Sequence, residues 1–260
     1  MNFYRSLGGS KKESSQMKEI PDKLVVLTFD DALSNHATYV APILKKYGFN
    51  ATFFVCEFPP LSLDGGVPCP GFENKEFYMS WEQIAELNEA GFEIGNHTMH
   101  HRFVTIPREE LLKEIQDLNL RCMENDIPVP ISFCYPANVT SEESPSVLNE
   151  IRFQWARRGG ESVYDPEVHH PLLIPSFEAP LKKDINEFAK MVNQAKEGKI
   201  IVLYFHGIPD LAHPWVSMER EAFEAYMEYL FKNDFKVFAM RELSNYMDPL
   251  ELQAKIRLGI

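Results

Sequence analysis

Residues 24–31 have the sequence LVVLTFDD, an apolar run that favours a β-strand and ends in two aspartates. An uninterrupted run of this kind is typical of a strand covered on both faces, as in a parallel sheet. Seven further apolar, β-rich runs occur at residues 51–55, 92–95, 131–135, 153–156, 172–174, 200–205 and 235–238. Segments with helical spacing separate them, at residues 36–47, 80–90, 107–125, 144–151, 183–197, 217–232 and 240–247. The alternation predicts an α/β fold built on a parallel sheet.

Length and composition predict one barrel-sized domain. The chain has 260 residues, of which 45% are hydrophobic, enough for a large core. Because α/β barrels often reach about 250 residues as one unit, we expect residues 21–260 to form a single (β/α) barrel, TIM-like with seven or eight strands. Residues 1–20 lack periodicity and are expected to form a flexible arm. The Pro- and Gly-rich residues 57–78 predict an insertion at the rim, which either shapes a substrate groove or serves as padding.

The charge balance argues against a nucleic-acid partner. The chain carries 26 Lys and Arg against 38 Asp and Glu, a formal charge of −12. Nucleic acids are usually bound by basic patches that neutralise phosphates, and no Lys/Arg run supplies one. No apolar stretch reaches the roughly 18 residues that a membrane-spanning helix needs. The sequence indicates no oligomeric state.

Two further features concern the cellular compartment. Residues 1–20 lack the apolar core of a signal peptide. We therefore expect a cytoplasmic protein if the chain is complete, and an exported one if a signal segment has been removed. The four cysteines, Cys56, Cys69, Cys122 and Cys134, form no C-x-x-C pair and are expected to be reduced and mostly buried.

Polar residues follow the predicted strands at the positions where the strands end. They are Asp30 and Asp31 after the first run, His97 and His101 after the third, Pro136 and Asn138 after the fourth, Arg157 and Arg158 after the fifth, and His206 after the seventh. In a (β/α) barrel the carboxyl ends of the strands meet on one face, where active sites are found. We therefore expect these residues, distant in sequence, to share one cleft.

The residue types in this set suit a divalent cation. Two adjacent carboxylates at the end of a buried strand repel each other, and burial raises their pKa, unless a cation compensates. His97 and His101 are four residues apart, and imidazole is a good zinc ligand. With one aspartate they make a three-ligand set, which leaves a position for water or substrate and is typical of a catalytic metal site. Taken singly, an H-x-x-x-H pair is often a surface accident and Asp-Asp is usually a solvated turn.

Four motifs together resemble those of one enzyme family. They are TFDDA at residues 28–32, HTMHH at residues 97–101, FCYP at residues 133–136, and His206 after an apolar strand. Their order and strand context, from about Lys23 to Met247, resemble the polysaccharide deacetylase family, the NodB-homology or carbohydrate esterase family 4 group. The third motif resembles a branch with Phe-x-Tyr-Pro. The resemblance implies a distorted (β/α) barrel and metal-dependent hydrolysis of an N-acyl group, commonly N-acetyl on an amino sugar of a glycan.

The resemblance also implies roles for residues at the strand ends. It implies Asp31, His97 and His101 as ligands of one divalent ion, with Zn2+ expected and Co2+, Ni2+ or Mn2+ as alternatives. Asp30 would then be the general base that takes a proton from the attacking water. His206, on another strand, would protonate the departing amine.

Further residues are expected to contact or orient the reacting groups. The resemblance implies the backbone N–H of Ala137 as an oxyanion donor, and Tyr135 and Trp215 are placed with the substrate. His213, in the same loop as Trp215, could also line the cleft. Many family members carry Arg where this chain has Cys134. The branch places an arginine on the following strand instead, so Arg157 is expected to orient Asp30.

Two alternatives to glycan deacetylation stay open at this point. One is hydrolysis of a small non-glycan amide of the ureide or cyclic imide type, because the Phe-x-Tyr-Pro branch includes such members; residues 57–78 would then act as a lid. The other is a carbohydrate-binding relative without turnover. The presence of Asp30, Asp31, His97, His101 and His206 argues against the second alternative.

Overall fold

The computed structural model describes residues 18–57 and 77–256 of the chain. Within this part, eight strands form one sheet in the order β5-β4-β3-β2-β1-β7-β6, with β8 also paired to β1. Every pairing between these strands is parallel. The strands are β1 (Leu24–Phe29), β2 (Thr52–Val55), β3 (Glu93–Asn96), β4 (Ser132–Cys134), β5 (Trp155–Arg157), β6 (Phe177–Glu178), β7 (Ile201–Phe205) and β8 (Lys236–Phe238). This arrangement confirms the predicted distorted (β/α) barrel.

Strand β1 lies at the centre of the sheet, and all six of its residues are buried. It pairs with β7 over most of its length, from Val25↔Ile201 to Phe29↔Phe205. Its other side is shared, because β8 pairs with its first half and β2 with its end. The aspartates that follow β1 therefore leave from the middle of the sheet.

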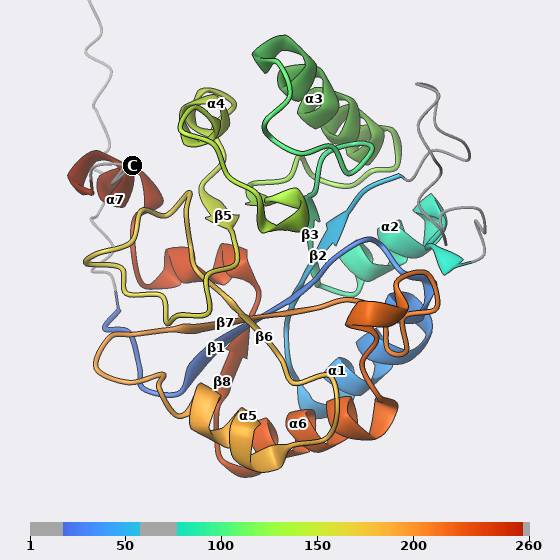
Figure 1. Ribbon diagram of the computed structural model, residues 1–260, viewed down its shortest axis with the longest axis vertical. Helices are drawn as coiled ribbons and strands as arrows, with labels where there is room; N and C mark the ends of the chain where they lie inside the picture. The colour runs from blue at the N-terminus through green and yellow to red at the C-terminus, as the bar shows by residue number, and fades with distance from the viewer. Residues whose placement is uncertain (1–17, 58–76, 257–260) are drawn as a thin grey trace, which may run out of the picture.

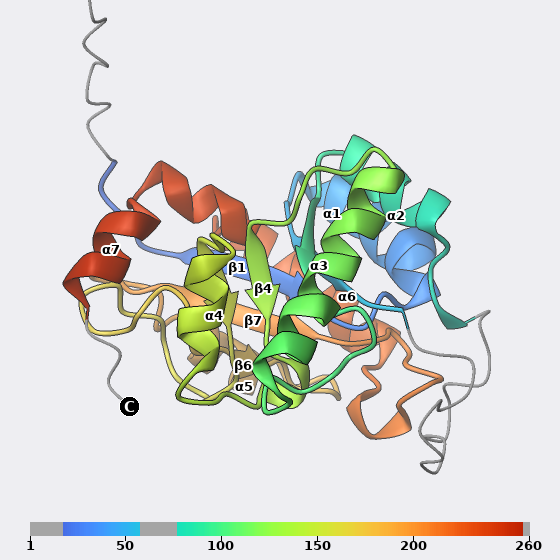
Figure 2. The ribbon, with the colours of Figure 1, turned by 90° about the horizontal axis from the view of Figure 1, so that it is seen from above.

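Helices surround the strands on both sides (Figure 1; Figure 2). They are α1 (Ala41–Tyr47), preceded by the π-helix η1 (His36–Val40), α2 (Trp81–Glu89), α3 (Arg108–Glu124), α4 (Ser144–Glu150), α5 (Ile185–Val192), α6 (Arg220–Lys232) and α7 (Pro249–Lys255). Figure 1 shows α1, α5 and α6 on one side of the strands and α3 and α4 on the other. The largest core cluster joins β1, β2 and β7 to the buried faces of α1, α2, α5 and α6.

One predicted strand lies elsewhere in the structure. Residues 172–174 do not form a strand; Ile174 makes a single bridge with Arg157 on β5. The strand in this region is β6, a few residues later, and it pairs with β7. Pro171 and Pro175 flank the predicted run and have no N–H for a ladder, which explains why pairing with β5 stops there. Residues 171–178 thus connect the two ends of the sheet.

The helix predictions also need three changes. The segment predicted at residues 183–197 is helical only as α5, which begins after its N-cap Asp184. Residues 240–247 form the 3₁₀-helix η5 (Met240–Asn245) rather than an α-helix. Helix α7 was not predicted; it begins after Asp248, whose side chain accepts hydrogen bonds from two backbone N–H groups of its first turn.

The predictions for the cysteines, the N-terminal arm and the rim insertion can be compared with the structure only in part. Cys56, Cys122 and Cys134 are free and buried, as expected, whereas Cys69 lies outside the described residues. Most of the expected arm (1–20) and of the expected rim insertion (57–78) also lies outside them. In the described part of the chain, no helix has the length and apolar character needed to cross a membrane.

Candidate active site and metal centre

The site lies where the central strands end, and the backbone there turns sharply. Asp31 and Ala32 after β1 have positive φ angles of 73° and 53°. Thr98 and His101 after β3 have values of 60° and 53°, and Ala137 after β4 has 51°. Left-handed backbone is disfavoured for residues other than glycine and is often retained at functional sites. Here it turns the chain at the ends of β1, β3 and β4 so that their polar side chains converge.

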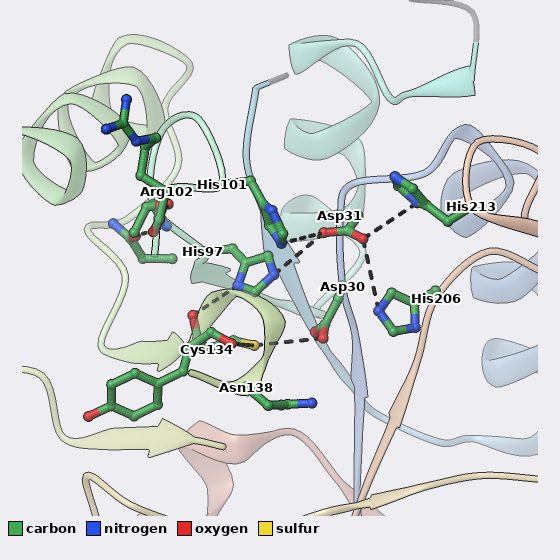
Figure 3. Close-up of polar contacts among 12 residues, drawn as sticks. Asp30, Asp31, His97, His101, Arg102, Cys134, Asn138, His206 and His213 are labelled. Atoms are coloured by element: carbon green, nitrogen blue, oxygen red, sulfur yellow. Dashed lines mark hydrogen bonds and ion pairs between the residues drawn. The ribbon is translucent and has the colours of Figure 1, made fainter. Parts of the chain in front are cut away.

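Asp31, His97 and His101 face one another across this end of the sheet (Figure 3). Asp31 Oδ1 lies 3.4 Å from His97 Nε2 and 3.5 Å from His101 Nε2. The other ring nitrogen of His97, Nδ1, lies 2.8 Å from the carbonyl oxygen of Cys134 and donates to it, so Nε2 is the ring nitrogen that faces Asp31. The three ligand atoms lie within 4.8 Å of one another. The set therefore has the donor types and spacing that suit a divalent cation.

Two observations support a cation at this position. Asp31 Oδ1 is buried, and no group among the described residues donates a hydrogen bond to it. Burial lowers the pKa of His101 to about 4, so at neutral pH its ring is uncharged and can act as a ligand. Burial would raise the pKa of Asp31, but His101, His97 and His206 lower it well below its usual range. A carboxylate and uncharged imidazole are the forms that bind a metal.

Asp30, the neighbour of Asp31, is held by Arg157. The guanidinium of Arg157 is fully buried and donates from Nη2 to Asp30 Oδ2. Its Nη1 donates to Asn138 Oδ1 at 3.2 Å and to Ser176 Oγ at 3.4 Å. Burial would raise the pKa of Asp30, but Arg157, His97 and His206 together outweigh this effect and lower it. Asp30 is therefore ionised at neutral pH and able to accept a proton.

A second group of potential ligands, Asp30, His97 and Cys134, overlaps the first at His97. It is the weaker candidate on chemical grounds. Burial raises the pKa of the Cys134 thiol, and the thiolate is the form that binds a metal. Asp30 Oδ2 is also occupied by Arg157. These contacts favour Asp31 over Asp30 as the carboxylate ligand.

His206 follows β7 and lies on the other side of the two aspartates. Its Nε2 is 3.9 Å from Asp31 Oδ2, and its side chain is 18% exposed. The ring meets Tyr204 edge-on, with centroids 5.9 Å apart. The His206 carbonyl lies 3.1 Å from His36 Nε2, which fixes the backbone just after β7. His206 is thus the partly exposed group at this side of the site.

The three residues expected to contact substrate differ in their positions. Ala137 is exposed just after β4, where its backbone turns with φ 51° and ψ 23°. Trp215 is 63% exposed, and its ring meets His213 edge-on at 5.5 Å. Tyr135 does not fit its expected role. Its side chain is fully buried in the core, where its hydroxyl donates to the carbonyl oxygen of Leu172 at 2.9 Å.

Sequence reasoning gave no role to Cys134 or Asp210, and it placed Asn138 and His213 only in the cleft. Cys134 Sγ contacts both Asp30 and Arg157, and Asn138 accepts from Arg157. Asp210 and His213, in the loop after β7, are both buried, and His213 Nδ1 lies 3.7 Å from Asp31 Oδ2. The D-x-x-H spacing was the available signal for the last pair, but it is too common in loops to indicate a site alone.

A (β/α) barrel with an Asp-His-His set and a second carboxylate beside it is typical of metal-dependent hydrolases. The chain belongs to the polysaccharide deacetylase family: the family model matches residues 17–156.

Comparisons with individual proteins agree with this family. The chain is 24% identical to a peptidoglycan-N-acetylglucosamine deacetylase of Bacillus cereus over 205 residues, which is 73% of this chain and 76% of the relative. It is 31% identical over 104 residues to YxkH of Bacillus subtilis, whose name places it among the polysaccharide deacetylases. That match covers 38% of this chain and only about a third, 32%, of YxkH.

A solved structure shows the same fold. The crystal structure of a Mycobacterium smegmatis protein described as a polysaccharide deacetylase superimposes with a TM-score of 0.64. The match covers 93% of this chain and 94% of that one, at 16% sequence identity. The likeness therefore covers most of the chain and extends past residue 156, where the matched family region ends.

Proposed function

We propose that this protein is a metal-dependent hydrolase that removes an N-acyl group, usually acetyl, from an amino sugar of a glycan or oligosaccharide. The observation that supports this function most strongly is the Asp31, His97 and His101 set with the ionised Asp30 beside it. The deacetylase relative supports the substrate class. The retained acidic and histidine residues disfavour a carbohydrate-binding protein without turnover.

Asp31, His97 and His101 would hold the cation, for which Zn2+ suits the donor set best. When bound, a divalent ion in such a site polarises the amide carbonyl and lowers the pKa of a water. Asp30 accepts the proton of the attacking water, and Arg157 keeps Asp30 oriented and ionised for that step.

Two further groups would act on the other atoms of the amide. The backbone N–H of Ala137, an exposed residue, is proposed to donate to the oxyanion that forms on the carbonyl oxygen. His206 is partly exposed and lies on the side of Asp31 away from His97 and His101. It is proposed to give a proton to the departing amine. Trp215 offers an exposed aromatic face on which a sugar ring can pack.

Acetate release from N-acetylated chito-oligosaccharides tests this function. The purified protein is expected to release acetate, to lose this activity on chelation of its metal, and to regain it with Zn2+. Asp30→Asn is expected to lower kcat by roughly 10²–10⁴-fold, the usual contribution of a general base, with little change in substrate binding.

Several results would contradict the proposal. Metal-free protein that cleaves at the full rate would reject the metal mechanism, and an Asp30→Asn variant with unchanged kcat would reject Asp30 as the base. A protein that hydrolyses a cyclic imide or ureide but releases no acetate from any acetylated oligosaccharide would favour the small-amide alternative.

A further inference from the structure

The two oxygens of Asp31 face different pairs of histidines (Figure 3). Oδ1 faces His97 and His101, at 3.4 and 3.5 Å. Oδ2 faces His213 Nδ1 at 3.7 Å and His206 Nε2 at 3.9 Å. His213 belongs to none of the motifs used above, yet it is only 5% exposed and lies against a candidate ligand. Its position therefore needs an explanation.

The loop after β7 holds His213 through Asp210, which is 2% exposed. Asp210 Oδ1 accepts from the backbone N–H of His213 at 2.6 Å, and Oδ2 accepts from the N–H of Gly207 at 3.0 Å. The Asp210 N–H in turn donates to Ser217 Oγ at 2.9 Å. Asp210 thus connects the start, the middle and the end of the loop.

The turn at Gly207 and a clamp from Asn35 stabilise the same loop conformation. A Cβ atom at Gly207 would lie 2.6 Å from the Asp210 Cα, so this close approach requires glycine. Asn35 Nδ2 donates to the carbonyl oxygen of Pro209 at 2.6 Å, and Asn35 Oδ1 accepts from the N–H of Ile208 at 3.2 Å. Because these contacts position the backbone, His213 is presented to Asp31 by a rigid loop.

The groups around His213 Nδ1 determine whether this ring nitrogen carries a hydrogen. The atom lies 3.4 Å from Asp210 Oδ2 and 3.7 Å from Asp31 Oδ2. Ionised carboxylates can only accept hydrogen bonds, so Nδ1 carries the hydrogen and donates. Its hydrogen-bond partner is Asp210 Oδ2, and at 3.7 Å its contact with Asp31 Oδ2 is electrostatic, on the oxygen that faces away from His97 and His101.

We propose that His213 is a positioning residue for Asp31, which holds the carboxylate with Oδ1 toward His97 and His101 and thereby strengthens cation binding. The inference rests on the proposed function only in taking these three residues as the metal ligands. Outer-shell partners of metal ligands fix their orientation, and losing one typically costs roughly 10- to 100-fold in metal affinity.

Co2+ and Zn2+ titration of the full chain against a chromogenic chelator, without any glycan, tests this role. His213→Leu keeps side-chain volume but removes the donor, and we expect it to weaken cation binding by roughly 10- to 100-fold. His213→Asn places an amide N–H near the Nδ1 position, and its affinity is expected to stay within a few-fold of wild type. Leu211→Ala, an exposed change in the same loop, is the control with wild-type affinity.

The comparison between donor positions keeps the test decisive. If His213→Leu does not fold, as judged by circular dichroism, His213→Gln replaces it, because its amide lies one bond further out and cannot occupy the Nδ1 position. Wild-type affinity in the Leu or Gln variant, or equal weakening in the Asn variant, would overturn the positioning role. A chain that binds cations but releases no acetate would reject the proposed function alone, and a wild-type chain that binds no cation would reject both.

Discussion

At the scale of single residues, the contact between Arg157 and Asp30 controls the orientation and ionisation of the proposed base, Asp30. The guanidinium contacts Asp30, Asn138 and Ser176 at once, which needs its planar fork of donors. Arg157→Lys keeps the charge but loses this fork, so we expect a lower kcat with a folded protein. Arg157→Ala leaves Asp30 buried without its cation, which costs about 3–5 kcal/mol in stability when a buried pair is broken. Steady-state kinetics and urea unfolding measure the two effects.

The neighbouring Arg158 provides the control for these variants. It is half-buried and donates to the backbone carbonyl of Leu173 rather than to the site. Arg158→Lys is therefore expected to keep the wild-type kcat. An Arg157→Lys variant with the kcat of Arg158→Lys would show that Asp30 needs only a nearby positive charge.

The residue types of this site were predictable from the sequence, whereas their contacts were not. Asp30, Asp31, His97 and His101 follow predicted strands, and their residue types and spacing, together with the family resemblance, indicated a cation site. Tyr135 was misplaced because strand alternation does not show which of its faces meets the core. Asp210 was not predicted, and His213 was expected only to line the cleft. Their roles depend on a loop that folding brings to Asp31 from 179 and 182 residues along the chain.

At the scale of elements, strand β3 leads directly into His97 and packs tightly on β2. Gly95 pairs with Phe54, and a Cβ atom there would lie 2.4 Å from two atoms of the Phe54 ring. We expect Gly95→Ala to lower stability by about 1–3 kcal/mol, the usual cost of overpacking a core. Thermal and urea unfolding measure the loss.

A double-mutant cycle identifies the cause of that loss. Phe54→Leu removes the ring atoms that a Cβ at Gly95 would meet, so the double variant is expected to lose less stability than the two single variants added together. Strict additivity would show that the ring moves aside and that packing between these strands is looser than the structure indicates.

The accuracy of the strand predictions followed the length of the apolar runs. The runs at residues 24–29 and 200–205 were located almost to the residue because long buried strands have a strong apolar pattern. Strand β6 has only two residues, and it lies just after the predicted run, where it pairs with β7. Such a short strand is determined by its neighbours, so no local pattern could indicate it.

At the scale of the whole molecule, a buried carboxyl joins several elements at the end of the barrel opposite the site. Glu93, the first residue of β3, accepts from Thr52 Oγ1 and Ser132 Oγ, both at 2.7 Å, and from the N–H of Arg241 at 2.8 Å. Thr52 Oγ1 also accepts from the N–H of Met240 at 2.8 Å. The contacts connect β2, β3, β4 and η5, so Glu93 supports the barrel as a unit.

The titration of Glu93 makes the stability of the barrel depend on pH. Burial raises the pKa of Glu93 above its ordinary value of 4.5, despite the hydrogen bonds that lower it. Since the folded state favours the protonated acid, its stabilising contribution is complete below pH 4.5 and is lost as pH rises through the higher folded pKa. Glu93→Gln does not titrate, so the stability difference between wild type and variant should decrease as pH rises from 4.5 toward 8. Urea unfolding at a series of pH values measures this difference.

Glu89→Gln, an exposed change in the preceding helix, is the control and should show the wild-type pH dependence. Parallel stability curves for Glu93→Gln and wild type would contradict the prediction. They would mean that the three donors fully accommodate the charge on Glu93.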